Sequence, residues 1–179
     1  MVVRIISGKY KGRKINTPRN LPVRPTTNFA KESLFNILTT QYSVEDKVVL
    51  DCFAGSGNMS FEFLSRGAKD VYGVDMSTKC IKHLIQTSKE WETDNFKAIK
   101  RDAIKFVKNA KIKFDIIFAD PPYDWPNYNE LINTVFEKEL LTDKGLLIIE
   151  HDKTHQFKTV PNFVEERIYG HVHFSIFEL

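Results

Sequence analysis

Five short apolar runs alternate with helix-like stretches from residue 47 onward, and this order constrains the fold more than any other feature of the sequence. The runs are Val48–Leu50, Val71–Val74, Phe96–Ile99, Ile116–Ala119 and Leu146–Ile149. Between them lie helix candidates at residues 58–66, 77–91, 103–110 and 127–140. Strands that alternate with helices at this spacing form βαβ units, in which helices cover both faces of a parallel sheet.

Two further β-rich runs, residues 164–169 and 172–177, are separated only by Gly170 and His171. Two residues are too few for a helical crossover, so we expect an antiparallel pair at the edge of the sheet. The predicted fold class is therefore α/β, with a Rossmann-like, mostly parallel seven-stranded sheet that ends in an antiparallel C-terminal hairpin.

The first 31 residues differ from the rest of the chain in charge. They hold eight of the 26 basic residues and none of the 23 acidic ones, so the remaining chain carries 18 − 23 = −5. Residues 2–6 and 13–16 are typical of two short strands around a glycine-containing turn. Three prolines predict an extended linker over 17–27, and an apolar stripe predicts a helix from about 28 to 41. We expect residues 1–41 to form an N-terminal extension and residues 42–179 the main domain.

The composition excludes several other classes of protein. No apolar run approaches the roughly 18 residues that a membrane helix needs. Cys52 and Cys80 provide neither a disulfide framework nor a metal-ligand cluster, and the first residues lack the apolar stretch of a secretory signal. We expect a cytoplasmic monomer without membrane contact.

The first strand of the alternating region runs into a glycine turn that opens a helix, with Asp51 beneath it and Gly57 at its end. A carboxylate at this position suits a cationic amino group better than a pyrophosphate. Asp75 ends the next strand, where a carboxylate can accept hydrogen bonds from ribose hydroxyls. Ser60 stands where a dinucleotide fingerprint has its third glycine. S-adenosylmethionine has an ammonium and a ribose but no phosphate, and it is the predicted cofactor; a tight turn without a ligand is the alternative.

The fourth strand of this region ends in Asp120-Pro121-Pro122-Tyr123. Two consecutive prolines lack backbone donors and keep the chain extended, which leaves nearby carbonyls available as acceptors. A side-chain oxygen and a backbone oxygen match the two N–H groups of an exocyclic base amine, and Tyr123 offers a face on which a base can stack. The motif predicts a methyl-acceptor site; the alternative is a proline-rich turn with an exposed Asp120.

Taken together, the glycine turn and the Asp-Pro-Pro-Tyr motif resemble class I S-adenosylmethionine-dependent methyltransferases that act on base amines. The strings Arg4–Lys14, Arg24–Thr27 and Glu32–Asn36 narrow the resemblance to the RsmD family, bacterial enzymes that methylate the exocyclic N2 of one guanine in 16S ribosomal RNA. The resemblance implies an acceptor site of Asp120, Pro121, Pro122 and Tyr123, and cofactor contacts from Asp51, Phe53, Ala54, Gly55, Ser56, Gly57, Asp75, Met76, Asp102 and Ala103. Taken alone, Asp102 serves equally well as a helix cap.

The basic extension gains a function from this resemblance. Lys9, Lys11, Arg13, Lys14 and Arg24 are predicted to contact RNA phosphates, with Tyr10 as an aromatic surface among them, and to hold the RNA over the carboxyl edge of the sheet. Without the resemblance, a solvated basic face explains the same residues. The expected partner is ribosomal RNA or a small-subunit assembly particle.

Three other functions remain open. An adenine-N6 methyltransferase of DNA fits the Asp-Pro-Pro-Tyr motif, but 179 residues leave little room for a target-recognition domain. A nicotinamide-dependent oxidoreductase would need a third glycine in the turn, which this sequence lacks. A non-catalytic RNA-binding module would leave the glycine turn without a function. His171 and His173 resemble half a metal site, but no third ligand is evident near them, so we expect no metal.

Overall fold

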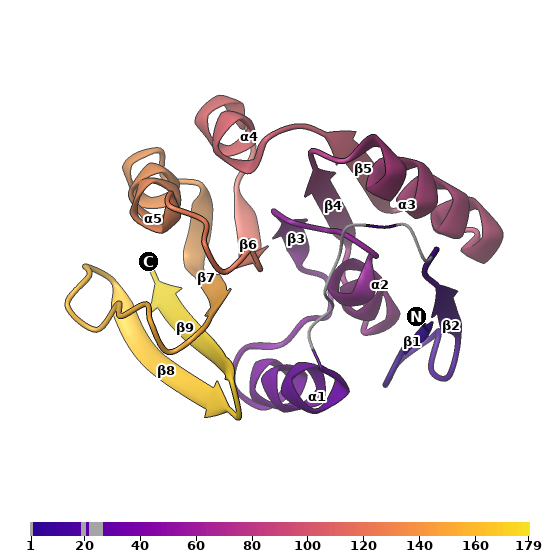
Figure 1. Cartoon of the computed structure of the whole chain (residues 1–179), viewed down its shortest axis with the longest axis horizontal. Helices are drawn as coiled ribbons and strands as arrows, with labels where there is room; N and C mark the ends of the chain where they lie inside the picture. Colours follow the sequence, from indigo (N-terminus) through magenta and orange to yellow (C-terminus); the bar gives the residue numbers. More distant parts are fainter. Residues whose placement is uncertain (1, 19–20, 22–26) are drawn as a thin grey trace.

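The structure is a computed structural model that describes residues 2–18, 21 and 27–179. A seven-stranded sheet has the order β5-β4-β3-β6-β7-β9-β8, with helices on both faces (Figure 1). Its strands are β3 (Val48–Asp51), β4 (Asp70–Asp75), β5 (Phe96–Lys100), β6 (Phe114–Ala119), β7 (Leu141–His151), β8 (Phe163–Tyr169) and β9 (Val172–Glu178). The first five pair in parallel, whereas β9 is antiparallel to β7 and to β8. The predicted α/β fold with its antiparallel C-terminal hairpin is confirmed.

The helices between the strands lie close to their predicted places. They are α2 (Asn58–Ser65), α3 (Thr78–Trp91), α4 (Ala103–Asn109) and α5 (Tyr128–Glu137). Only α5 and β7 depart clearly from the prediction, because α5 ends at Glu137 and Glu139 takes a positive φ of 51°. The chain therefore turns early, and β7 begins at Leu141, five residues before the apolar run that predicted it. No helix in the described part of the chain is both long and apolar enough to cross a membrane.

Neighbouring residues of the central strands point to opposite faces of the sheet and enter two separate cores. Val49 and Ile116 belong to the core under α1, α2 and α3, whereas Leu50 and Ile117 belong to the core under α4 and α5. This is the two-residue period of a strand that is buried on both faces. It explains why the strands read as continuous apolar runs in the sequence.

The N-terminal extension packs into the first of these cores. It contains the antiparallel pair β1 (Val2–Arg4) and β2 (Lys14–Asn16) and then α1 (Asn28–Ile37). Helix α1 continues into a π-helical turn, η1 (Leu38–Tyr42), which crosses the boundary expected after residue 41. Thr27 caps α1 by accepting a hydrogen bond from the amide of Ala30 at 3.2 Å. Buried apolar side chains of the hairpin and of α1, such as Ile5 and Leu34, lie in one core with the sheet.

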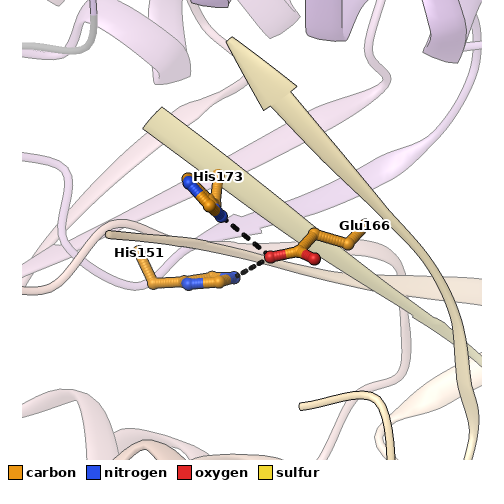
Figure 2. A group of neighbouring side chains, drawn as sticks. All are labelled: His151, Glu166 and His173. Carbon is orange, nitrogen blue, oxygen red and sulfur yellow. Dashed lines mark hydrogen bonds and ion pairs between the residues drawn. The ribbon is translucent and has the colours of Figure 1, made fainter. Parts of the chain in front are cut away.

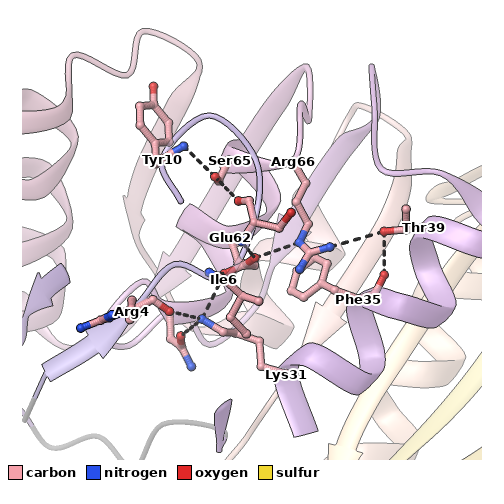
Figure 3. Close-up of polar contacts among 11 residues, drawn as sticks. Arg4, Ile6, Tyr10, Lys31, Phe35, Thr39, Glu62, Ser65 and Arg66 are labelled. Carbon is pink, nitrogen blue, oxygen red and sulfur yellow. Dashed lines mark hydrogen bonds and ion pairs between the residues drawn. The ribbon is translucent and has the colours of Figure 1, made fainter. Parts of the chain in front are cut away.

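A buried polar network joins the extension to α2 (Figure 3). Lys31 on α1 and Glu62 on α2 form an ion pair at 3.1 Å, and neither side chain is exposed. The Lys31 ammonium also donates to the Arg4 carbonyl at 2.9 Å and to Oδ1 of Asn58 at 2.8 Å. The Glu62 carboxylate accepts from the amides of residues 6 and 7 and from Nε of Arg66. Lys31 therefore neutralises a carboxylate inside the protein and is not part of the basic surface.

The tip of the hairpin lies at the amino-terminal edge of the sheet. The amide of Lys9 donates to the carbonyl of Ser65 at 2.7 Å, and the amide of Tyr10 donates to the Ser65 hydroxyl at 2.9 Å. Ser65 is the last residue of α2, which returns from the carboxyl end of β3 to the start of β4. Tyr10 also packs on Trp91, the last residue of α3, at a centroid distance of 5.4 Å. The tip thus docks on the ends of two helices that point away from the carboxyl edge.

Candidate functional site

The two motifs singled out in the sequence meet at the carboxyl edge of the sheet. β3 lies between β4 and β6, and Asp51 pairs with Gly73 on one side and Phe118 on the other. The chain leaves β3 toward β4 on one side, while β6 extends the sheet on the other. This is the switch point at which open α/β sheets bind ligands. Asp120 follows Phe118 by two residues and so lies at the same edge as the glycine turn.

The glycine turn connects β3 to α2 and is fixed by backbone hydrogen bonds. The amide of Ala54 donates to the Val74 carbonyl at 2.9 Å, and the amide of Gly57 donates to the Ala54 carbonyl at 2.7 Å. Gly57 caps α2 in the left-handed region, with a φ of 83°. A Cβ atom on Gly57 would lie 2.6 Å from the Phe61 ring and 2.8 Å from Leu84. The position therefore requires glycine for its conformation and for its packing.

Asp51 is a buried carboxylate at the base of this turn. Its Oδ2 atom accepts a hydrogen bond from the Ser60 hydroxyl at 2.6 Å, whereas Oδ1 is buried without a hydrogen-bond partner among the described residues. Burial raises the pKa of Asp51 to about 7, and the hydrogen bond from Ser60 opposes the shift. An orphaned carboxylate oxygen is costly unless a donor reaches it. The site therefore fits a cationic amine such as the ammonium of S-adenosylmethionine.

Ser60 is the site residue whose role the sequence did not reveal. It occupies the position of the missing third glycine, is fully buried, and orients Asp51 through its hydroxyl. Its distance of nine residues from Asp51 gave no reason to connect the two. The sequence signal that could have revealed this role is the serine at the position of the third glycine, because a buried serine hydroxyl needs a hydrogen-bond partner.

Two further predicted cofactor residues make local backbone contacts. Asp75 accepts hydrogen bonds from the amide of Gly55 at 2.8 Å and from that of Ser77 at 2.7 Å, so its carboxylate braces the glycine turn. Asp102 caps α4 by accepting from the amide of Lys105 at 2.9 Å. The helix-cap alternative for Asp102 is therefore present in the structure, and the cofactor role remains a prediction.

The remaining predicted cofactor residues surround the same turn. Ala54, Ser56 and Ala103 are buried, whereas Met76 is 68% exposed. Phe53 packs edge-to-face against Trp125, with ring centroids 5.1 Å apart and planes at 78°. This contact joins the glycine turn to the segment that follows the acceptor motif. Trp125 in turn packs on Tyr128 at 5.4 Å, so both rings belong to the packing of α5.

The acceptor motif leaves β6 as a short extended segment followed by a turn. Pro121 is buried and Pro122 is exposed, and the Pro122 carbonyl accepts a hydrogen bond from the Trp125 amide at 2.9 Å. Tyr123 is 36% exposed. A pocket of about 240 Å³ opens beside it, lined by Tyr123, Asp152, Lys153, Gly170, His171 and His173. A ring, an acidic residue and several basic groups therefore border a hollow at the carboxyl edge.

The predicted RNA-binding residues that the structure describes are exposed, but the hairpin tip lies on the other side of the molecule. The side chains of Lys9, Lys11, Arg13 and Lys14 all reach solvent, and Arg24 lies outside the described residues. Tyr10 is only 6% exposed and supports Lys9 and Arg13 from below, so the aromatic surface expected there is wrong. The tip lies beyond the far end of α2, which is about 12 Å long, and not over the carboxyl edge. Lys14 is closer to that edge, because it pairs with Arg4, whose carbonyl accepts from the same Lys31 ammonium that binds Asn58 at the start of α2.

Comparison with known proteins matches the chain along almost its whole length. The family model described as conserved hypothetical protein 95 matches residues 3–178. Ribosomal RNA small subunit methyltransferase D of Escherichia coli K12 is 31% identical, covering 98% of this chain and 89% of the relative. The protein of the same name from Haemophilus influenzae is also 31% identical, with coverages of 98% and 93%.

Solved structures give the same result for the fold. The Escherichia coli protein yhhF, described as a methyltransferase, is 30% identical and superposes with a TM-score of 0.88, covering 99% of this chain and 98% of its own. A hypothetical protein of Thermus thermophilus is 25% identical and has a TM-score of 0.85, with coverages of 99% and 100%.

Proposed function

The chain belongs to the RsmD family of S-adenosylmethionine-dependent methyltransferases, and we propose that it methylates the exocyclic N2 amine of a guanine in small-subunit ribosomal RNA. The observation that carries the proposal is the juxtaposition of Asp51 and Asp120 at one edge of the sheet, joined through the β3–β6 register. One carboxylate suits a cationic amine and the other suits a neutral base amine. The names of the relatives support ribosomal RNA as the substrate class.

The cofactor half of the site consists of four residues. Asp51 would bind the cofactor's ammonium through Oδ1, which has no hydrogen-bond partner in the described part of the chain, and Asp75 would accept the ribose hydroxyls while it braces Gly55. Asp102 and the adjacent buried Ala103 would border the adenine. When bound, S-adenosylmethionine supplies an electrophilic methyl group on a sulfonium.

The acceptor half of the site rests on Asp120 and Pro121. The Asp120 carboxylate and the Pro121 carbonyl would accept the two N–H groups of the guanine amine and so orient its nitrogen. That nitrogen is a weak nucleophile because its lone pair is delocalised into the ring. Acceptors that favour a pyramidal amine therefore stabilise the transition state more than the ground state. Tyr123 would stack on the flipped base, and Asp120 or water would take the proton after transfer.

Comparing two substitutions at Asp120 tests the acceptor role. In Asp120→Asn one acceptor oxygen becomes an amide donor, and in Asp120→Ala both oxygens are lost. We expect kcat to fall at least 100-fold in both variants, whereas the affinity for S-adenosylhomocysteine stays within threefold of the wild type. Asp124, a nearby exposed carboxylate, provides the control variant Asp124→Asn. Wild-type rates for both Asp120 variants would remove this residue from the mechanism.

The substrate itself is tested on ribosomal RNA. Nucleoside mass spectrometry of small-subunit RNA from cells with and without the gene should show loss of one N2-methylguanosine, restored by the purified protein. Appearance of the missing methyl group on adenine, or on DNA, would refute the guanine assignment. Incubation of the purified protein with free RNA and with small-subunit particles identifies which of the two is the substrate.

We also propose that the exposed basic residues of the hairpin bind phosphates. The tip contacts Ser65 at the end of α2, whereas the acceptor motif lies at the sheet edge where α2 begins, so the RNA would extend along the hairpin and reach the motif from there. Lys9, Lys11 and Lys14 can be changed to alanine together, leaving Arg13 to pack on Tyr10 and Trp91. We expect weaker RNA binding and a salt slope smaller by about 2, since each phosphate contact contributes about 0.7–0.9.

Three exposed lysines elsewhere, Lys111, Lys138 and Lys144, form a matched control for the triple variant. Their replacement by alanine removes the same net charge from another part of the surface. If both triple variants bind RNA equally well, the hairpin is not a specific phosphate-binding surface.

A further inference from the structure

Three neighbouring antiparallel strands bring two histidines and a glutamate to one face of the sheet. His151 ends β7 and pairs directly with His173 on β9. Glu166 on β8 pairs with Ser175, two residues farther along β9. Side chains two residues apart on a strand point to the same face, so His151, His173 and Glu166 converge (Figure 2).

The possible ligand atoms of these three residues are close together. Nδ1 of His173 lies 2.8 Å from Oε1 of Glu166, and Nε2 of His151 lies 4.0 Å from the same oxygen. All three ligand atoms lie within 4.8 Å of one another. Four-coordinate zinc with bonds of about 2.0–2.2 Å requires ligand atoms about 3.3 Å apart. The distances of 2.8 Å and 4.0 Å lie on either side of this value, so small side-chain rotations would complete the geometry.

The orientation of His151 is fixed by its other ring nitrogen. Nδ1 lies 2.7 Å from the carbonyl oxygen of Asp152, which can only accept, so Nδ1 carries the proton. Nε2 then carries the lone pair, which accepts a hydrogen bond from the Ser175 hydroxyl at 2.8 Å; this hydroxyl would rotate away when Nε2 binds an ion. A backbone carbonyl that holds the distal N–H of a histidine is a common outer contact of metal ligands. Lys158 also lies beside the cluster, with Nζ 3.6 Å from Oε2 of Glu166.

We propose that His151, Glu166 and His173 form a binding site for a divalent transition-metal ion of the zinc type. Two imidazoles and one carboxylate are a donor set that zinc takes with a fourth position open to water. His151 is fully buried, whereas His173 is 12% exposed and lines the pocket beside Tyr123, which provides a route for the ion. The ion would join β7, β8 and β9 next to the acceptor motif and stabilise that wall of the pocket. It takes no part in methyl transfer.

The sequence pointed to a different pair of residues. His171 and His173 stand together in the chain, but His171 lies in the exposed turn before β9. The partners that the sequence did not reveal are His151 and Glu166, which are 22 and 7 residues from His173 and meet it only through strand register. The sequence alone predicts no metal, because nothing in it identifies His151 and Glu166 as neighbours of His173.

Titration calorimetry tests the site on the full chain after removal of metals with a chelator. We expect the wild type to bind one Zn²⁺ per chain with a dissociation constant of 1 µM or below. The variants Glu166→Gln and His173→Gln should bind at least 100-fold more weakly. His171→Gln and His155→Gln remove nearby imidazoles that are not ligands and should retain wild-type affinity. Equal affinities across all four variants, or a wild-type dissociation constant above about 1 mM, would overturn the proposal.

Thermal unfolding gives a second readout, in which the Tm of each protein with Zn²⁺ is compared with the Tm of the same protein without it. Zn²⁺ should raise the Tm of the wild type and of His171→Gln by several degrees, because a ligand that binds only the folded state stabilises it. It should leave the Tm of Glu166→Gln unchanged. Equal Tm shifts in all three proteins would show that the ion binds elsewhere. Neither measurement depends on methyl transfer, so the metal site and the proposed function can fail separately.

Discussion

Replacing Lys31 with methionine tests how firmly the N-terminal extension is joined to the body of the protein. Methionine keeps most of the side-chain volume but loses the contacts to Glu62 at 3.1 Å, to Asn58 at 2.8 Å and to the Arg4 carbonyl at 2.9 Å. Breaking a buried ion pair by removing one partner costs about 3–5 kcal/mol. Glu62 keeps three other donors, so we expect about 3 kcal/mol, the lower end of this range.

Urea unfolding followed by circular dichroism measures this cost, and thermal unfolding gives a second measure. For a chain of this size, each kcal/mol lowers the Tm by about 2–4 °C, so we expect a decrease of roughly 6–12 °C. The control is Lys108→Met, which breaks an exposed ion pair with Glu130 and should cost less than about 1 kcal/mol. If the Lys31 and Lys108 variants lose the same small amount of stability, the buried network does not join the extension to α2.

Three further predictions follow from buried contacts. Burial raises the pKa of Asp51 from an ordinary 3.8 to about 7, so between these pH values the folded state keeps a proton that the unfolded state has lost. The free energy of unfolding should therefore fall as pH rises from 4 to 7. Urea titrations at pH 5 and pH 8 span about two of the pH units between the two pKa values, so the wild type should lose roughly 3 kcal/mol between them, and Asp51→Asn should remove this loss; an unchanged loss would assign it to another group. Ser60→Ala removes the donor 2.6 Å from Asp51 and should cost about 1–3 kcal/mol in the same assay; a loss below 0.5 kcal/mol would contradict the role given to this hydroxyl. Gly8→Ala places a Cβ atom 1.8 Å from the Ser65 carbonyl, whereas Gly12→Ala has the same positive φ and an open surrounding, so Gly8→Ala should be the more destabilising by at least 2 kcal/mol.

The sequence predicted those parts of the fold that depend on local pattern. The apolar runs and helix stripes located the sheet because its central strands β3, β6 and β7 are largely buried on both faces. The two-residue spacer at Gly170 and His171 predicted the terminal hairpin. The sequence did not predict the end of α5, because Glu139, and not a glycine, adopts the left-handed conformation that ends the helix.

The site was predictable where its residues follow one another in the chain. The glycine turn and the Asp-Pro-Pro-Tyr segment each consist of consecutive residues. They lie at the same edge of the sheet because both follow parallel strands. The hydrogen bond of Ser60 to Asp51, the burial of Lys31 against Glu62 and the docking of the hairpin on Ser65 are contacts between distant segments. Composition describes Lys31 only as one more basic residue, and tertiary packing decides that it is internal.

The position of α1 beside the C-terminal hairpin has a consequence for synthesis. Phe29 on α1 packs edge-on against Tyr169 on β8 at 5.9 Å, across 169 − 29 = 140 positions of the chain, and Leu34 shares a core with Phe174. A ribosome adding 5–20 residues per second needs roughly 7–28 s to produce that partner after α1 has emerged. During this interval the apolar stripe of α1 lacks part of its final cover, so the protein completes its fold only after the last strands have been made.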